Sequence, residues 1–293
     1  MGCKRLIMFV VMLSAMLVRE TVGHGAMIDP PARNYMGKAG FSVPINYDYN
    51  SQYCGGFYNL KNHGGKCGVC GDPWQGPRPH EPGGIYATDV IGRCYLKRTK
   101  TINVTISITA WHKGYFSFKM CPHNNPKTNA SQSCFDQYPL QLVSGGYKYD
   151  ITNNQDNTHK VQLKLPKKLK CTQCILQWTY TTGNSWGCDG SICGLGLGSQ
   201  EVFINCADIA ILSDCSTVSK PNTKRVIPET TKPSSGSNGK QNCKAAGAWT
   251  GQKSMDNWCV VNCNAVPPFC PGTHCICERS VSLSNVLYRR TKS

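Results

Sequence analysis

Cysteine is the residue that most constrains how this chain can fold. The 293-residue sequence contains 19 cysteines, and Cys3 stands apart near its start. Twelve more lie between Cys54 and Cys215, and the last six lie between Cys243 and Cys277. Both of these groups are even, as disulfide frameworks in an oxidising compartment require. The spacing predicts two separately cross-linked units, and it leaves the pairing within each unit open.

Two Cys-x-x-Cys pairs offer an alternative, because such pairs can build a zinc ribbon. They are Cys67 with Cys70 and Cys171 with Cys174, and about 100 residues separate them. A zinc ribbon uses a much shorter spacing. We therefore interpret both pairs as members of disulfides.

The first 23 residues have the anatomy of a secretory signal. A basic start (MGCKR) precedes an apolar run from Leu6 to Val18, and a short polar stretch ends at the small residue Gly23. The run is too short to span a bilayer, which takes about 20 residues. We predict cleavage after Gly23 and a secreted, extracellular protein without a membrane span. Its mature chain would begin at His24.

Composition divides the rest of the chain into a large domain (24–215), a linker (216–242), a cysteine-rich module (243–277) and a tail (278–293). The linker is rich in Lys, Thr, Ser, Pro and Gly and shows no apolar periodicity. The module is too small to bury an adequate core and must be stapled. Its Trp249, Trp258 and Phe269 are either a sugar-stacking surface or its entire core.

The large domain has the pattern of an all-β fold. Residues 101–109 alternate strictly, with Ile, Val, Ile and Ile on one face and Thr, Asn, Thr, Ser and Thr on the other. Further strands are expected at 115–120, 161–165, 175–180 and 202–212. Residues 30–82 lack periodicity, which predicts a loop region pinned by disulfides with short helical turns. A β-sandwich with long loops at one end follows from this order.

The formal charge of +16 invites a nucleic-acid interpretation. We expect no nucleic-acid partner, because the Lys and Arg residues are scattered along the sequence and a secreted protein rarely meets nucleic acid. Adhesion to acidic surfaces or matrix fits the charge better. Two sequons, at Asn103 and Asn129, are compatible with glycosylation.

An N-terminal histidine can chelate a metal ion. The α-amine and ring Nδ1 of His24 can bind one ion together, and a metal can displace the amine's proton near neutral pH. A third nitrogen would complete a copper-binding set, and His112 stands out because it follows the strongest predicted strand. Two imidazoles and an amine suit Cu(II). The other histidines are interpreted as surface or hydrogen-bonded residues in polar loops: His63, His80, His123, His159 and His274.

Several segments together resemble one enzyme family. They are HGAM at 24–27, DPPAR at 29–33, CGG at 54–56, GGKCGVCGD at 64–72, Ala110-x-His112 and QEVFxxCADI at 200–209. In this order they resemble the lytic polysaccharide monooxygenases of auxiliary activity family fifteen, found in insects, other invertebrates and some viruses. The resemblance covers residues 24 to 215.

The resemblance implies a copper site on the flat end of an immunoglobulin- or fibronectin-like β-sandwich. His24 and His112 would supply the three nitrogens, and Phe203 would occupy the axial position. Glu201 would lie near the oxygen-binding position, and Ala110 would abut the copper from the other side. One departure concerns the substrate face, because residues 34–41 lack an expected tryptophan. Tyr47 and Tyr49 are candidates for that face, with core packing as the alternative.

The resemblance predicts a monomeric, copper-dependent enzyme that cleaves β-1,4-linked polysaccharide, chitin first and cellulose second. Its partners would be insoluble polysaccharide, an external electron donor, and hydrogen peroxide or dioxygen. A hydrolase with paired carboxylates is a second enzyme hypothesis, although no spacing singles out a pair. A third hypothesis is a non-catalytic secreted protein that binds polysaccharide or matrix and retains the fold.

Overall fold

In a computed structural model of the protein, the described residues are 24–218, 241–246, 250, 256, 259–260, 263–264 and 275–278. Several predictions fall outside them and stay predictions: the signal segment, most of the linker, the tail, Trp249, Trp258, Phe269 and His274. No helix in the described part of the chain is long and apolar enough to cross a membrane.

Strands dominate the described elements, as the sequence predicts. The strands are β1 (His24–Asp29), β2 (Arg93–Leu96), β3 (Thr101–Ala110), β4 (Tyr115–Cys121), β5 (Tyr149–Asp150), β6 (Thr158–Lys164), β7 (Cys171–Thr181), β8 (Trp186–Asp189), β9 (Ile192–Leu195), β10 (Val202–Leu212), β11 (Asn242–Ala245) and β12 (Cys275–Glu278). Two short helices are α2 (Phe57–Asn62) and α3 (Gln132–Asp136). The five predicted strands are confirmed as β3, β4, β6, β7 and β10.

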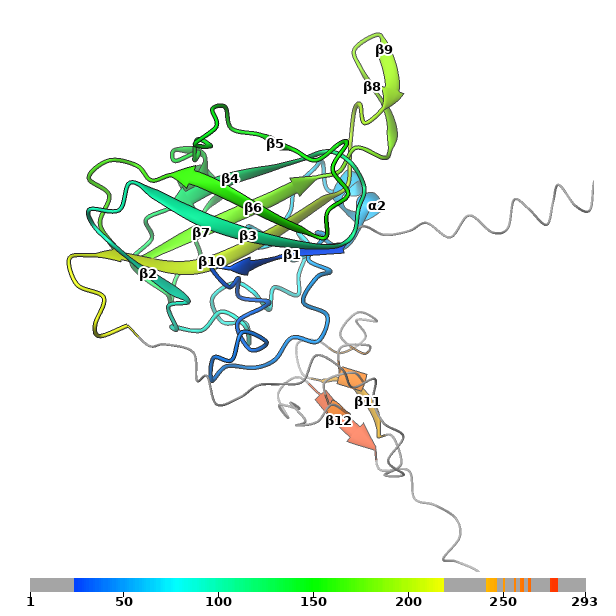
Figure 1. Cartoon of the computed structure of the whole chain (residues 1–293). Coiled ribbons are helices and arrows are strands. Elements are labelled where there is room, and N and C mark those ends of the chain that lie inside the picture. Colours follow the sequence, from blue (N-terminus) through cyan, green and yellow to red (C-terminus); the bar gives the residue numbers. More distant parts are fainter. Residues whose placement is uncertain are drawn as a thin grey trace, which may run out of the picture.

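Two sheets form a β-sandwich (Figure 1). One sheet has the order β1-β3-β6, and the other has the order β2-β10-β7-β4-β5. The pairings within both sheets are antiparallel except that of β10 with β2. The inward residues of β3 and β6 pack against those of β4, β7 and β10 in one apolar core. The predicted all-β sandwich is confirmed.

Strand β10 is buried on both faces. A strand in a two-sheet sandwich usually has one face toward the core and the other toward solvent. Its Phe203, Ala207 and Ile209 face the core between the sheets. Its other face meets the long region before β2, where Cys206 is bonded to Cys70. The loops predicted for residues 30–82 therefore cover β10 on the outer face of the five-stranded sheet.

A buried ion pair fixes these loops on β10. The guanidinium of Arg33 lies 2.7 Å from the carboxylate of Asp208, and both side chains are 4% exposed. Arg33 also donates to the carbonyl of His80, and Gln173 donates to Asp208. Because a buried charge is costly unless it is paired and hydrogen-bonded, this network sets one position for the loop.

The cysteine pairing settles the question of a zinc ribbon. Cys171 is bonded to Cys174 itself, whereas Cys67 and Cys70 pair with Cys54 and Cys206. The remaining described disulfides of this domain join Cys94 to Cys215, Cys121 to Cys134 and Cys188 to Cys193. The interpretation of both Cys-x-x-Cys pairs as disulfide members is confirmed.

The cysteine-rich module also contains disulfides in its described part. Strands β11 and β12 pair, and bonds join Cys243 to Cys277 and Cys259 to Cys275. The sulfurs of Cys243, Cys263 and Cys277 lie close enough together to suggest a metal site. All three are in disulfides, however, so they offer no thiolate ligands.

The interpretation of His159 as a polar loop residue is wrong. It lies on β6, where it is buried between the rings of Phe116 and Tyr149. Burial is the main cause that lowers its pKa, which favours the uncharged ring. The inward face of β6 is His159, Val161 and Leu163, and a search for apolar alternation misses its first member.

His80 is a hydrogen-bonded loop residue, as expected, and it is buried. Its Nδ1 lies 2.7 Å from Asp72, its Nε2 lies near the amides of Asn46 and Gln52, and its ring stacks on Tyr86. His63 and His123 are hydrogen-bonded to backbone carbonyls near the surface, as expected.

Two Arg–Asp ion pairs, one buried and one exposed, give a stability test. Replacing Arg33 with Leu should lower the free energy of unfolding by about 3–5 kcal/mol, because it leaves Asp208 as a buried, uncompensated charge. Arg93 pairs with Asp29 at side-chain exposures of 48% and 43%, so Arg93→Leu should cost only about 0–1 kcal/mol. Denaturant unfolding measures both values, and equal losses would contradict a special role for the buried pair.

Candidate metal centre

The pairing of β1 with β3 brings the two predicted ligands together. His24 lies opposite Ala110 in the antiparallel register, and His112 follows Ala110 by two residues, just past the end of β3. The sequence did not predict β1 as a strand. Residues separated by 88 positions thus meet at one end of the sandwich through a sheet contact.

Close contacts and hydrogen bonds restrict the backbone beside His24. Gly25 has no side chain, and a Cβ there would lie 2.6 Å from Cδ1 of Ile108. The Gly25 N–H donates to the carbonyl of Asn50 at 3.0 Å. The hydroxyl of Thr109 donates to the carbonyl of His24 at 3.4 Å. This close packing explains why glycine follows the histidine and fixes where the histidine side chain starts.

The backbone of His112 is held by a buried tyrosine. Its N–H donates to the hydroxyl of Tyr180 at 2.9 Å, and that hydroxyl donates to the carbonyl of Lys113 at 2.8 Å. The carbonyl of His112 accepts from the N–H of Gly183 at 2.9 Å. Burial raises the pKa of Tyr180, so its hydroxyl stays protonated and can donate.

The ring of His112 has two polar neighbours at Nδ1. The side-chain amide of Asn184 lies 2.9 Å away, and a carboxylate oxygen of Glu201 lies 3.9 Å away. Burial first, and then the nearby charge of His24, lowers the pKa of His112. Both effects favour the neutral imidazole, which is the form that binds a metal.

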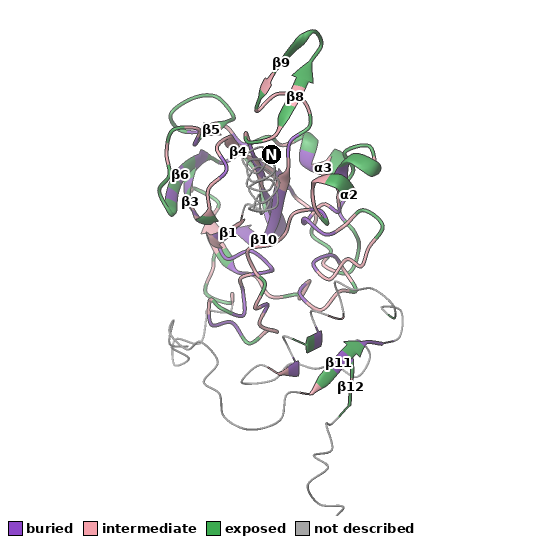
Figure 2. Cartoon of the chain, turned by 90° about the vertical axis from the view of Figure 1, so that its right-hand side faces the viewer, coloured by how far each residue is buried: buried purple, intermediate pink, exposed green. Residues whose placement is uncertain are grey.

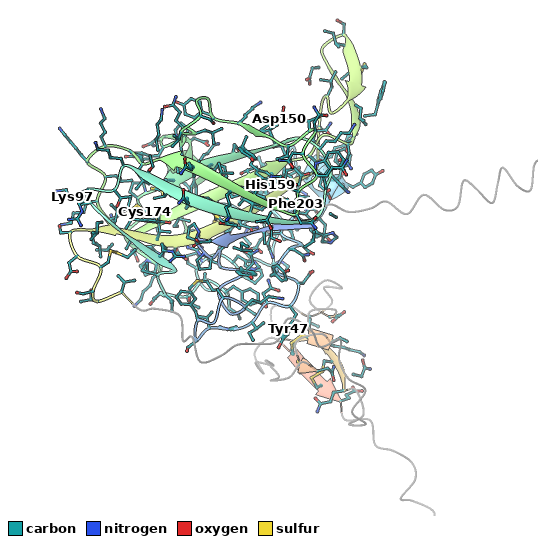
Figure 3. The ribbon with its side chains drawn as sticks, viewed as in Figure 1. Tyr47, Lys97, Asp150, His159, Cys174 and Phe203 are labelled. Carbon is teal, nitrogen blue, oxygen red and sulfur yellow. A yellow bond between two sulfur atoms is a disulfide. The ribbon has the colours of Figure 1, made fainter. Side chains whose placement is uncertain are left out.

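A cluster of aromatic rings adjoins His112 through Tyr180. Phe203, at the start of β10, is fully buried and stacks on Tyr180 with ring centres 5.8 Å apart. The ring centre of Tyr53 lies 6.1 Å from that of Phe203. Phe203 offers no donor atom. Figure 3 marks its place within the sandwich.

Tyr47 and Tyr49 are half-buried on the loop before Asn50. The ring of Tyr49 packs edge-on against Tyr35 and lies 4.3 Å from the ammonium group of Lys38. Burial raises the pKa of Tyr47. Their role in a substrate surface stays a prediction.

Sequence reasoning missed three residues that contact the site. Tyr180 lies on a predicted strand, but nothing in the alternation indicates that its hydroxyl binds the backbone of His112. Asn184 follows the end of β7 in a stretch without periodicity. Tyr53 stands in the loop region. Only contacts between residues far apart in the sequence show that these three residues adjoin the site.

Comparisons with known proteins are consistent with this geometry. A family model described as "Lytic polysaccharide mono-oxygenase, cellulose-degrading" matches residues 24–209. The structure of an AA15 lytic polysaccharide monooxygenase from Thermobia domestica, in the Cu(I) state, is 41% identical. It aligns with a TM-score of 0.63 over 65% of this chain and 100% of that chain.

The chain belongs to the lytic polysaccharide monooxygenases. It is of the AA15 type, and the resemblance found in the sequence is confirmed. Two weaker structural likenesses are LPMO10B from Micromonospora aurantiaca and the fusolin spindles of Wiseana spp entomopoxvirus. The first is 13% identical over 64% of this chain and 99% of that chain, with a TM-score of 0.39. The second is 14% identical over 58% of each chain, with a TM-score of 0.30. A comparison with curated proteins gives no match.

Lytic polysaccharide monooxygenases are copper enzymes, so this chain is a copper-dependent polysaccharide monooxygenase. The residues present fit copper in their chemistry, because imidazole nitrogens suit Cu(II). A histidine that binds a metal commonly hydrogen-bonds through its other ring nitrogen. At Nδ1 of His112 the neighbour is the side-chain amide of Asn184, whose oxygen accepts the Nδ1–H when the amide is turned toward the ring.

The hydroxyl of Tyr180 provides a test of how this monooxygenase holds His112. Tyr180→Phe removes two hydrogen bonds and should lower the free energy of unfolding by about 1–3 kcal/mol. It should also weaken Cu(II) binding about tenfold, because it frees the backbone of His112. Tyr149→Phe is the matched control, since that ring stacks on Phe116 away from His112. Calorimetric copper titration reports the outcome, and an affinity unchanged by Tyr180→Phe would contradict this role.

Proposed function

We propose that this protein is a secreted chitin-oxidising enzyme whose copper is held by His24 and His112. The amine and Nδ1 of a terminal His24 would supply two nitrogens, and the ring of His112 would supply the third. The observation that carries this proposal is the register of β1 on β3, which sets His24 opposite Ala110 and beside His112. The proposal requires cleavage after Gly23, since only then is the amine free.

Copper bound there would supply one-electron chemistry. An external donor would provide electrons, and hydrogen peroxide or dioxygen would be the oxidant for a carbon beside a β-1,4 glycosidic bond. The protein's own groups have other tasks. With its amide oxygen turned toward the ring, Asn184 would accept the Nδ1–H of His112 and leave Nε2 for the metal. Phe203 would place a ring without a donor atom beside the metal. The small side chain of Ala110 leaves room beside His24.

We assign proton transfer to Glu201. Its carboxylate is largely buried at the start of β10 and lies 3.9 Å from Nδ1 of His112. Its backbone carbonyl accepts hydrogen bonds from Thr182, which fix the position of the residue. A carboxylate held at the edge of the site can accept or deliver the protons that the reduction of dioxygen or peroxide consumes.

The β8–β9 hairpin is the strongest candidate for substrate contact in the described domain. It projects beyond the end of the sandwich, with exposed residues along both strands (Figures 1 and 2). Trp186 is 71% exposed and pairs across the hairpin with the exposed Leu195, and Ile192 is also exposed. The Cys188–Cys193 disulfide staples the strands. An apolar surface this exposed marks an interaction site.

The base of the hairpin connects this surface to the metal centre. Asn184 contacts His112, and the next residue, Ser185, bonds with the side chain of Gln200, which precedes Glu201. A sugar chain lying across the copper end could therefore reach Trp186. Apolar side chains at Ile192 and Leu195 favour chitin over cellulose, because the acetamido methyl groups of chitin give them a partner. Tyr47 and Tyr49 remain secondary candidates for this face.

The proposal keeps the division of the chain made from its composition. The catalytic domain would be residues 24–215, closed by the Cys94–Cys215 bond. The linker (216–242), the cysteine-rich module (243–277) and the tail (278–293) would follow. The enzyme would act extracellularly as a monomer. Asn103 and Asn129 are exposed, as glycosylation there would require.

The N-terminal chelate gives the sharpest test of the metal site. A protein with one extra alanine before His24 should fold normally but lose the amine as a ligand. Changing an outer-shell partner alone costs about 10–100-fold in metal affinity, so this loss should reach at least about 100-fold. Calorimetry with Cu(II) compares it with protein that begins at His24 and with His112→Ala. Equal affinity with and without the extra residue would sink the proposed ligand set.

The hairpin gives a separate test of the substrate face. Trp186→Ala should weaken binding to insoluble chitin about fivefold, the equivalent of about 1 kcal/mol of ring stacking. Tyr147→Ala is the matched control, because Tyr147 is 53% exposed but lies outside the hairpin. Mass spectrometry of products on chitin and cellulose, with and without ascorbate, identifies the substrate. Oxidised products from cellulose alone would overturn the choice of chitin.

A further inference from the structure

Two basic segments with the same pattern lie at turns of the sandwich. Residues 97–100 read Lys-Arg-Thr-Lys, and residues 167–170 read Lys-Lys-Leu-Lys. All six cationic residues are exposed. The first segment follows β2 and leads into β3, and the second joins β6 to β7. The two segments are 70 positions apart, so the sequence alone shows only scattered charge.

The fold brings the two segments together. The N–H of Leu165 donates to the carbonyl of Lys100 at 2.9 Å, which joins the two turns directly. The N–H of Lys97 donates to the carbonyl of Leu212 at 2.7 Å. Cys171, which follows the second segment, pairs with Ile211. Both segments thus meet at the C-terminal end of β10, and we call their six Lys and Arg residues the basic end.

The basic end lacks matching negative charge. None of its six residues forms an ion pair with a described residue. Residues 94–101 and 164–172 contain no Asp or Glu. Asp214 is the acidic residue of the neighbouring segment, and its carboxylate accepts hydrogen bonds from Ser216. Six like charges held together repel each other, and an anionic ligand would relieve this repulsion.

The basic end is remote from the metal centre. Phe203 stands at the start of β10, and Leu212 ends the strand nine residues later. At the usual rise of a strand this is about 30 Å. Figure 3 shows Lys97 and Phe203 toward opposite ends of the sandwich. A ligand at the basic end would not lie over copper.

We propose that the basic end binds an acidic polysaccharide with sulfate or carboxylate groups. The ligand would anchor the enzyme while its copper end stays free for a neutral chain. The choice of polysaccharide rests on the proposed extracellular location, which the disulfides favour. Five of the six cations are lysines, whose compact ammonium groups pair with single anionic groups. Neither segment contains an aromatic residue, although stacking rings are typical of sites for single-stranded nucleic acid.

The test measures binding of the full chain to heparin, used as a sulfated polysaccharide probe, at physiological salt. Replacing Lys167, Lys168 and Lys170 with Gln should weaken the affinity at least about tenfold, because charges gathered within a Debye length act together. The control replaces Lys61, Lys127 and Lys160, which are exposed but dispersed, with Gln. It changes net charge equally and should weaken binding about twofold at most.

Two outcomes would overturn the proposal. Equal losses in both triple variants would mean that heparin responds to net charge alone. Competition by double-stranded DNA at the same charge concentration, as strong as that by heparin, would mean that the basic end does not select polysaccharide. Oxidation of insoluble chitin is measured in parallel and should be the same in both variants. The heparin assay does not need copper, so its result is independent of whether the proposed chitin activity is correct.

Discussion

The double burial of β10 is the constraint on which most of this structure depends. One face of the strand completes the core between the sheets, and the other must be covered because it also carries apolar and ion-paired side chains. The long region before β2 provides this cover, held by Arg33 and by the Cys70–Cys206 bond. The buried ion pair and the disulfide thus anchor this region on β10, and it can support a site at one end.

The metal centre follows from that rigidity. The same loop region reaches β1, where Asn50 accepts from Gly25 and donates to Thr109. On the opposite side, Tyr180 joins the core to the backbone of His112. Hydrogen bonds and packing among the protein's own groups therefore position two histidines from distant segments. A preorganised site loses less conformational entropy when a ligand binds.

The two ends of the sandwich differ in chemistry. The proposed copper end combines His24, the buried His112 and a carboxylate with a projecting apolar hairpin, which suits an uncharged sugar chain. The other end gathers lysines from two turns without matching acids. Part of the net charge of +16 is thus concentrated at one end of the sandwich, which composition alone could not show. A charged anchor at the copper end would compete with the neutral surface that the reaction needs.

The sequence by itself determined the all-β class, the five main strands and the two histidines worth testing. These depend on local signals: alternation along a strand, an even cysteine count, and a histidine placed after a signal segment or a strand. Only the tertiary structure decided which cysteines pair, that His159 is buried, and that Asn184 and Tyr180 contact His112. It also decided that Lys100 and Leu165 adjoin. Each of these is a contact between residues far apart in the chain, and no local pattern specifies which distant partner a residue meets.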